Sequence, residues 1–220
     1  MVEKVLELPE AIDFWDRRHQ AADELLSGGD MSFDHAGNEI FYALRTGRLI
    51  DLIGDASSVA APKRILDAGC GKGVFSRQMA EFGHRVDGID SSQHAIELCR
   101  VDATDRERYA ESTLDAWHPP YLYDVVYCVD VLFHIMDDDV WAASVRNLAS
   151  LVAWGGLLLL ADHGGDEDRL WSNYQRTRAA SRYDALLLDR GFRRDGFQAQ
   201  ALADDRVQGL LLAGRCVLAR

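Results

Sequence analysis

Between residues 64 and 161, short apolar runs alternate with stretches in which apolar residues recur every three or four positions. The first pattern predicts strands and the second predicts amphipathic helices. The predicted strands cover residues 64–67, 85–89, 108–112, 123–129 and 157–161. The predicted helices cover residues 74–82, 93–101 and 140–152. The glycine pair 155–156 is expected to end the last helix. This alternation predicts a mostly parallel sheet with right-handed crossovers.

Helical periodicity also covers both flanks of this part. Residues 10–26 and 36–53 precede it, with a Ser-Gly-Gly-Asp break between them. Residues 168–189 follow it as one long predicted helix, and residues 193–202 and 208–218 follow as two strands. Only five residues join those strands, which is too short for a crossover helix, so we expect them to pair antiparallel.

The expected fold is therefore α/β: a doubly wound, Rossmann-like sheet of seven mostly parallel strands with an antiparallel last strand. We expect residues 1–60 to form an N-terminal helical lid and residues 61–220 to form the main domain. Ligands of doubly wound sheets bind outside the carboxyl ends of the strands, so candidate chemistry is sought there.

The composition is that of an ordinary globular chain. Of 220 residues, 48% are hydrophobic and 27% are charged, which excludes a disordered or fibrous protein. The net charge of −12 disfavours nucleic acids and anionic membrane surfaces as partners. No apolar stretch is long enough to span a bilayer, and the first ten residues lack the pattern of a signal peptide, so we expect a cytoplasmic protein. The four cysteines form no C-x-x-C pair, so we expect reduced thiols and no zinc site.

Glycines cluster directly after the first predicted strand, in the segment DAGCGKG of residues 67–73. Glycine lets the backbone turn sharply and lets a ligand approach it closely. Asp90 directly follows the second predicted strand and lies 23 positions after Asp67. A carboxylate at that place can accept hydrogen bonds from both hydroxyls of an adenosine ribose. The loop and the acid together predict a site for an adenosine-containing ligand.

The spacing of the glycines indicates which class of nucleotide or nucleoside the loop could bind. The sequence contains no Walker loop, G-x-x-x-x-G-K-[ST]. The dinucleotide fingerprint G-x-G-x-x-G needs a glycine where Val74 stands, because the third glycine here is Gly73. Asp67 would repel a pyrophosphate and suits an ammonium group, bound directly or through water. These features favour a cationic, phosphate-free adenosine such as S-adenosylmethionine over a dinucleotide.

Four segments together resemble the class I S-adenosylmethionine-dependent methyltransferases. They are DAGCGKG at 67–73, VDGIDSS at 86–92, YDVVYCVDVLFH at 123–134 and WGGLL at 154–158. The resemblance extends over about residues 60–220 and is specific for the cofactor, but weak for the methyl acceptor. It implies S-adenosylmethionine as the cofactor.

The resemblance also assigns residues to the parts of the cofactor. The methionine part is expected beside Asp67, Gly69, Cys70 and Gly71. The ribose is expected beside Asp90 and Ser91, and the adenine beside Ser112, Thr113 and Leu114. Where the family usually has Gly-Asp-Ala this chain has EST at 111–113, so a hydroxyl or a backbone amide would replace the carboxylate. Cys128 ends the fourth predicted strand, where the backbone usually passes the sulfonium, and ordinary strand packing is the alternative for its side chain.

Methyl transfer is an in-line displacement at a sulfonium, so the enzyme aligns the nucleophile and excludes water. A neutral hydroxyl or a protonated amine also needs a general base. The candidates follow the fourth and fifth strands: Asp130 with His134, and Asp162 with His163. Each histidine could act as the base, and each aspartate could orient an imidazole or bind an acceptor hydroxyl. The alternatives are a structural His134, an exposed loop His163 and an octahedral metal site, for which the match is loose.

The two N-terminal helices are the expected lid, since such a segment covers the cofactor and shapes the acceptor pocket in the enzymes this chain resembles. We expect Phe14, Trp15 and His19 to face the acceptor. Tyr42 and Arg45 are expected at the cofactor, because a guanidinium suits its carboxylate. The alternative for each residue is packing on the main domain or exposure to solvent.

The sequence thus predicts an S-adenosylmethionine-dependent methyltransferase that acts on a hydroxyl or an amine of a small molecule, such as a secondary metabolite or a sugar. No nucleic-acid partner, membrane partner or metal is expected, and an oligomer is compatible with the sequence. Two alternatives stay open. One is an NAD-dependent oxidoreductase, which the glycine spacing disfavours. The other is a non-catalytic, cofactor-binding subunit of another protein.

Overall fold

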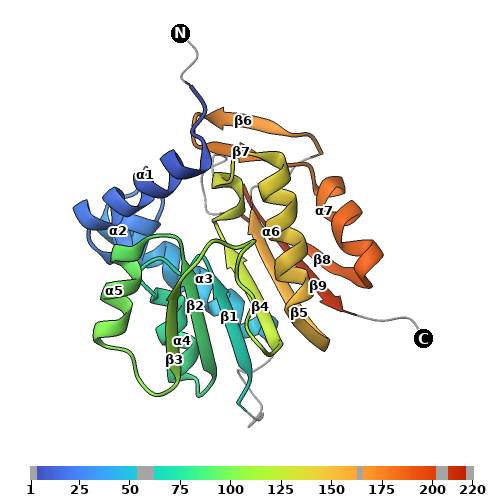
Figure 1. Ribbon diagram of the computed structural model, residues 1–220, viewed down its shortest axis with the longest axis horizontal. Coiled ribbons are helices and arrows are strands. Elements are labelled where there is room, and N and C mark those ends of the chain that lie inside the picture. Colours follow the sequence, from blue (N-terminus) through green and yellow to red (C-terminus); the bar gives the residue numbers. More distant parts are fainter. Residues whose placement is uncertain (1–3, 54–61, 163–165, 202–207, 217–220) are drawn as a thin grey trace. The chain divides into compact units, whose positions relative to one another are not determined.

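The computed structural model describes residues 4–53, 62–162, 166–201 and 208–216. The chain divides into two compact units. The first unit is Asp13–Ser112, and the second unit joins Met1–Ile12 to Thr113–Arg220. The fold is Rossmann-like α/β with a mostly parallel central sheet (Figure 1).

The first unit contains three parallel strands in the order β3-β2-β1. The strands are β1 (Arg64–Ala68), β2 (Arg85–Asp90) and β3 (Glu107–Glu111). Helix α4 (Val74–Glu81) connects the first two, and α5 (Gln93–Val101) connects the last two. Most residues of β1 and β2 are buried, which is typical of parallel strands covered on both faces. The register aligns the carboxyl ends of β1 and β2, so the glycine loop and Asp90 leave the sheet at the same edge.

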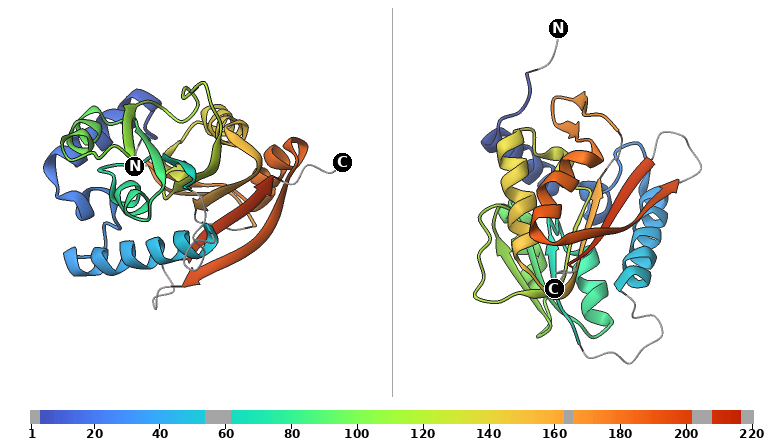
Figure 2. Two further views of the ribbon diagram at one scale, coloured as in Figure 1. Left: turned by 90° about the horizontal axis from the view of Figure 1, so that it is seen from below. Right: turned by 90° about the vertical axis from the view of Figure 1, so that its right-hand side faces the viewer.

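The N-terminal helices are α1 (Leu8–Ala21), α2 (Glu24–Gly28) and α3 (His35–Ile53). Figure 2 shows α3 as one straight helix. The single helix predicted over residues 10–26 is wrong, because the chain breaks after Ala21. Asp23 starts a new helix there, since its side chain accepts a hydrogen bond from the N–H of Leu26.

The second unit is built around β4 (Tyr123–Val129) and β5 (Val152–Asp162), which pair parallel. Strand β9 (Gln208–Cys216) pairs antiparallel with β5, and β8 (Phe192–Ala201) pairs antiparallel with β9. The antiparallel final strand is therefore confirmed, and Figure 2 shows β8 and β9 as two long red strands side by side.

Helix η1 (Leu132–His134) and α6 (Asp138–Ser150) lie between β4 and β5 in the chain. Asp137 caps α6, because its side chain accepts hydrogen bonds from the N–H groups of Asp139 and Val140. The apolar side of α6 is buried. It consists of Trp141, Val145 and Leu148.

The glycine pair 155–156 does not end α6, contrary to the prediction. The helix ends at Ser150, and both glycines lie inside β5. Gly155 has a φ of 72°, and the pairing of β4 with β5 shifts register near this point. A Cβ on Gly156 would lie 2.9 Å from the carbonyl oxygen of Asp124, so the glycines allow an irregular close approach of the two strands.

The long helix predicted over residues 168–189 is also wrong. Its first half is a hairpin of β6 (Arg169–Ser172) and β7 (Gln175–Thr177), and only α7 (Ala180–Leu187) is helical before η2 (Leu188–Arg190). The apolar side chains of Leu170 and Trp171 in this hairpin are about half exposed. No helix among the described residues is long and apolar enough to cross a lipid bilayer.

Candidate functional site

The glycine loop after β1 turns back onto the end of β2. Gly69 and Cys70 both donate their backbone N–H to the carbonyl of Ile89, at 2.8 and 2.9 Å. Gly71 donates its N–H to Oδ2 of Asp90 at 2.9 Å. Gly69 and Gly71 have φ values of 84° and 51°, a region that a Cβ disfavours. These three successive N–H groups bond within the protein, so they do not form the cradle that a phosphate needs.

Asp90 is held through both of its carboxylate oxygens. Oδ2 accepts the N–H of Gly71, and Oδ1 accepts the N–H of Ser92 at 2.8 Å. Each carboxylate oxygen has two lone-pair sites, so room remains for two further donors. A ribose offers two hydroxyl donors. The loop and the turn after β2 therefore fix the direction of this carboxylate and leave it able to bind a diol.

Beneath the loop, the side chains are buried and paired. Asp67 accepts a hydrogen bond from the hydroxyl of Ser76 on α4, at 2.6 Å. The Sγ atoms of Cys70 and Cys99 contact the carbonyl oxygen of Gly71, at 3.6 and 3.4 Å. Burial raises the pKa of the Cys70 thiol well above its usual range, so this side chain is a neutral packing group. Reduced thiols were predicted, and no disulfide involves Cys70, Cys99 or Cys128 in the part of the chain that the structure describes.

His19 of α1 covers the glycine loop, although its predicted role was on the acceptor side. Its side chain is 4% exposed, and its Cε1 lies 3.3 Å from where a Cβ of Gly71 would be. Its Nδ1 has no hydrogen-bond partner among the described residues. Burial lowers the pKa of His19, and the nearby Asp90 carboxylate offsets only part of this effect. Lys72 also connects the glycine loop to the end of α1, because its Nζ donates a hydrogen bond to the carbonyl of Ala22 at 2.7 Å.

The other N-terminal candidates pack among themselves and on the first unit. Phe14 and Trp15 are half-buried, with their rings edge to face at 5.3 Å. Tyr42 is buried, and its ring lies 5.2 Å from that of Phe75 on α4. The guanidinium of Arg45 lies 4.2 Å from the centre of an aromatic ring on its own helix. These contacts fit the packing alternative that the sequence left open. A contact of Phe14 and Trp15 with the acceptor, and of Tyr42 and Arg45 with the cofactor, stays a prediction.

The segment after β3 begins beside Asp90. Ser112 donates its backbone N–H to the carbonyl of Asp90 at 2.9 Å, so the two strand ends are tied together. Thr113 and Leu114 follow in the second unit, where Leu114 is buried and its carbonyl accepts a hydrogen bond from the side chain of Asn147. The predicted contact of this segment with adenine remains a prediction.

At the end of β4, the chain takes an unusual conformation. The side chain of Cys128 is fully buried in the strand, as the packing alternative predicts. Asp130 is the only non-glycine residue with a positive φ among the ranges that the structure describes, at 58°. Its N–H donates to the carbonyl of Ala161 at 3.1 Å, which ties it to β5. Such strained positions cluster at functional sites, although aspartate tolerates this region better than most residues.

His134, on η1, is oriented by its neighbours. Its Nδ1 lies 2.9 Å from the carbonyl oxygen of Tyr174, and its ring stacks on that of Tyr174 at 5.9 Å and 16°. A carbonyl oxygen can only accept, so Nδ1 carries the proton. The lone pair of the neutral imidazole is therefore on Nε2, which is the arrangement a general base requires.

Asp162, at the end of β5, is 1% exposed and accepts a hydrogen bond from the hydroxyl of Tyr183. Trp141 in turn donates its indole N–H to that hydroxyl at 3.2 Å. Burial and the Asp162 carboxylate raise the pKa of Tyr183, which keeps the phenol protonated and able to donate. The Tyr183 hydroxyl therefore fixes the position of the Asp162 carboxylate. His163 lies outside the described residues.

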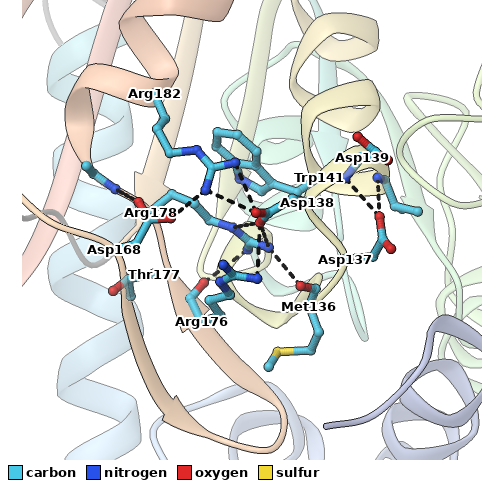
Figure 3. Close-up of polar contacts among 12 residues, drawn as sticks. Met136, Asp137, Asp138, Asp139, Trp141, Asp168, Arg176, Thr177, Arg178 and Arg182 are labelled. Atoms are coloured by element: carbon cyan, nitrogen blue, oxygen red, sulfur yellow. Dashed lines mark hydrogen bonds and ion pairs between the residues drawn. The ribbon is translucent and has the colours of Figure 1, made fainter.

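A second polar cluster lies where α6, the β6–β7 hairpin and α7 meet (Figure 3). Three arginines surround Asp138 there: Arg176, Arg178 and Arg182. Arg178 is fully buried, donates to Asp138 at 3.0 Å and lies over the Trp141 ring at 5.1 Å. Burial disfavours the ionised form of Asp138, but the arginines outweigh this and lower its pKa. Arg182 also pairs with Asp168. Because these donors are used within the protein, the cluster holds the three elements together.

The family assignment comes from comparison with known proteins. A family model described as a methyltransferase domain matches residues 41–202. The chain belongs to the class I S-adenosylmethionine-dependent methyltransferases. The cofactor of this family is S-adenosylmethionine, as the resemblance implied.

Among curated relatives, a ubiquinone biosynthesis O-methyltransferase from Aeromonas salmonicida is 36% identical over 117 residues. The match covers 51% of this chain and 48% of that relative. The chain therefore spans about half the length of the curated relatives it matches.

Two solved structures share the fold of this methyltransferase. The N-methyltransferase NodS from Bradyrhizobium japonicum WM9, in complex with S-adenosylhomocysteine, has a TM-score of 0.72 at 19% identity. The comparison covers 93% of this chain and 97% of that chain. The 1,6-didemethyltoxoflavin-N1-methyltransferase from Burkholderia thailandensis has a TM-score of 0.67 at 18% identity, over 97% of this chain and 92% of that one.

Sequence reasoning missed several residues that position the candidates. The most prominent are Asp16, Ser76, Tyr174 and Tyr183. Ser92 is the N-cap of α5, because its side chain accepts a hydrogen bond from the N–H of Ala95. The four missed residues act on partners nine to 76 positions away in the sequence, and no local pattern reveals such pairs.

Proposed function

We propose that this chain transfers a methyl group from S-adenosylmethionine to a hydroxyl or an amine of a small molecule. The observation that carries the proposal is the Asp90 carboxylate, which is aimed by Gly71 and Ser92 and keeps lone pairs for a ribose. The glycine loop supports the same ligand class, since its N–H groups bond within the protein and a phosphate-free nucleoside needs no cradle from them.

We keep both oxygen and nitrogen as candidate acceptor atoms, because the similar proteins include methyltransferases of both kinds. The curated relative from Aeromonas salmonicida is named as an O-methyltransferase, and NodS is named as an N-methyltransferase. Either atom needs a lone pair aligned with the methyl group, and a hydroxyl or a protonated amine also needs a base. A small-molecule acceptor, a secondary metabolite or a sugar among them, fits this chemistry.

We assign the base to His134 in this proposal. Its Nδ1–H donates to the Tyr174 carbonyl, which leaves the lone pair on Nε2 to take a proton from the acceptor. Asp130 and Asp162 are proposed to orient the acceptor or the imidazole. Asp162 suits an orienting role best, because the Tyr183 hydroxyl and burial hold it in place. His163 remains a second candidate for the base.

The proposal keeps three expectations from the sequence. Residues 1–60 act as the lid, residues 61–220 act as the methyltransferase domain, and the domain's strands form one seven-stranded sheet. The contact of His19 with Gly71 supports a role of the N-terminal helices at the cofactor.

The test is methyl transfer from radiolabelled S-adenosylmethionine to a panel of phenols, catechols, sugars and amines. Turnover of any of them, with release of S-adenosylhomocysteine, supports the proposal. Cofactor binding without turnover of any acceptor would favour the non-catalytic subunit. Binding of NADH and not of S-adenosylhomocysteine would favour the oxidoreductase and would contradict the proposal.

A further inference from the structure

Helix α1 contacts both turns of the first unit that carry the proposed cofactor residues. Asp16, His19 and Ala22 recur every three positions, so they lie near one face of the helix end. His19 covers Gly71 in the glycine loop, and the carbonyl of Ala22 accepts from Lys72 in the same loop. Asp16 reaches the other turn, between β2 and α5.

The Asp16 carboxylate is bonded to that turn by two hydrogen bonds. Its Oδ1 accepts from the hydroxyl of Ser92 at 2.7 Å and from the backbone N–H of His94 at 3.0 Å. Its Oδ2 accepts from the side chain of Gln20, one helical turn along α1, at 2.7 Å. The hydrogen bonds from Ser92 and His94 lower the pKa of Asp16, so it is ionised at neutral pH. An anion at this place also suits the N-terminal end of α5.

Ser92 is the link between Asp16 and Asp90. Its side chain is fully buried and makes two bonds: the hydroxyl donates to Asp16 and accepts the N–H of Ala95 as the N-cap of α5. Its backbone N–H donates to Oδ1 of Asp90 at 2.8 Å. The position of the Ser92 backbone therefore sets one of the two bonds that aim the Asp90 carboxylate.

We infer that Asp16 is a positioning residue of the cofactor site: it holds Ser92, and through Ser92 it aims Asp90 at the cofactor ribose. The inference rests on the proposed function, because it needs Asp90 to bind the ribose. Helix α1 would then position a cofactor-binding residue in addition to its expected role as part of the lid. The role of Asp16 is to hold Ser92 and not to contact the cofactor itself.

A double-mutant cycle tests whether Asp16 acts through Asp90. The affinity for S-adenosylhomocysteine is measured by calorimetry for the wild type, Asp16→Ala, Asp90→Ala and the double variant. We expect Asp16→Ala to weaken binding about tenfold in the wild type and less than twofold when Asp90 is already absent. Equal losses in both backgrounds, or no loss in the wild type, would overturn the inference.

Two further variants keep the test independent of folding. Asp16→Asn retains an oxygen that can accept from Ser92 and His94, so it should restore most of the affinity lost in Asp16→Ala. Asp13→Ala is the matched control, because Asp13 is an exposed carboxylate on the same helix that pairs only with Arg17 in the contacts of the described residues. It should bind like the wild type. Equal loss in Asp16→Asn and Asp16→Ala, with both folded by thermal unfolding, would contradict the positioning role.

The wild-type arm separates this inference from the proposed function. A wild type that fails to bind S-adenosylhomocysteine contradicts the cofactor assignment, and the inference falls with it. A wild type that binds while the cycle is additive contradicts the role of Asp16 alone.

Discussion

Replacing Asp90 by asparagine converts one of two accepting oxygens into a donating NH₂ group. The two carboxylate oxygens accept from different N–H groups, of Gly71 at 2.9 Å and of Ser92 at 2.8 Å. The amide has one oxygen and one NH₂ group. In either orientation of the amide, its NH₂ group faces one of the two backbone N–H groups. The N–H of Gly71 or that of Ser92 therefore loses its acceptor.

The same change affects a bound ribose, because one of its two hydroxyls also meets an NH₂ group in place of an oxygen. A hydrogen bond to a charged group contributes about 1.5–3 kcal/mol, so losing one lowers the affinity roughly 10- to 150-fold. The unpartnered backbone N–H additionally lowers the free energy of unfolding by about 1–3 kcal/mol. Asp90→Asn should therefore lose both affinity and stability, which a purely surface carboxylate would not.

Calorimetric titration of S-adenosylhomocysteine gives the affinity, and urea unfolding gives the stability. The matched control is Asp105→Asn, an exposed carboxylate of the same unit, which should change neither quantity. A folded Asp90→Asn variant that binds within twofold of the wild type would refute the assignment of Asp90 to the ribose.

Three more outcomes follow from single contacts. Arg178→Met should lower the free energy of unfolding by about 3 kcal/mol in urea titrations, because the buried guanidinium donates to Asp138 and to two backbone carbonyls. A decrease of less than about 1 kcal/mol would contradict this expectation. Burial lowers the pKa of His19, so the imidazole of the unfolded chain binds a proton at a higher pH than that of the folded chain. The stability contributed by the neutral imidazole is therefore complete above about pH 6.5, and it is lost as the pH falls below that value. His19→Gln should therefore flatten the decline of stability from pH 7 to pH 5, and an unchanged slope would count against the buried, neutral imidazole. His134→Asn should lower kcat about 10²- to 10⁴-fold while leaving S-adenosylhomocysteine affinity unchanged, and retention of full kcat would move the base to another residue.

The sequence predicted the parts of the fold that depend on local patterns. Strand β4 and helix α5 lie at the predicted residues, because β-branched and aromatic residues or a period near 3.6 mark them clearly. The glycine loop was also predictable, since positive φ at Gly69 and Gly71 restricts those positions to glycine.

Most of what the sequence missed depends on contacts between distant residues, and one helix break depends on a local side-chain cap. The helix predicted over 168–189 gives way to a hairpin, and Arg178 beside that hairpin bonds Asp138, 40 positions away. The break between α1 and α2 depends on a side-chain cap at Asp23 that competes with an otherwise continuous helical period. The link from Asp16 to Ser92 spans 76 positions. Local propensity carries no information about such pairs, so the positioning residues of the site could not be predicted from the pattern.

In the proposed function, the glycine loop and Asp90 bind S-adenosylmethionine. The most direct test of this binding is calorimetric titration of the purified protein with S-adenosylhomocysteine, with NADH titrated in parallel. We expect saturable binding of S-adenosylhomocysteine at one site per chain and no binding of NADH. Binding of NADH without S-adenosylhomocysteine, or binding of neither by a folded protein, would contradict this expectation.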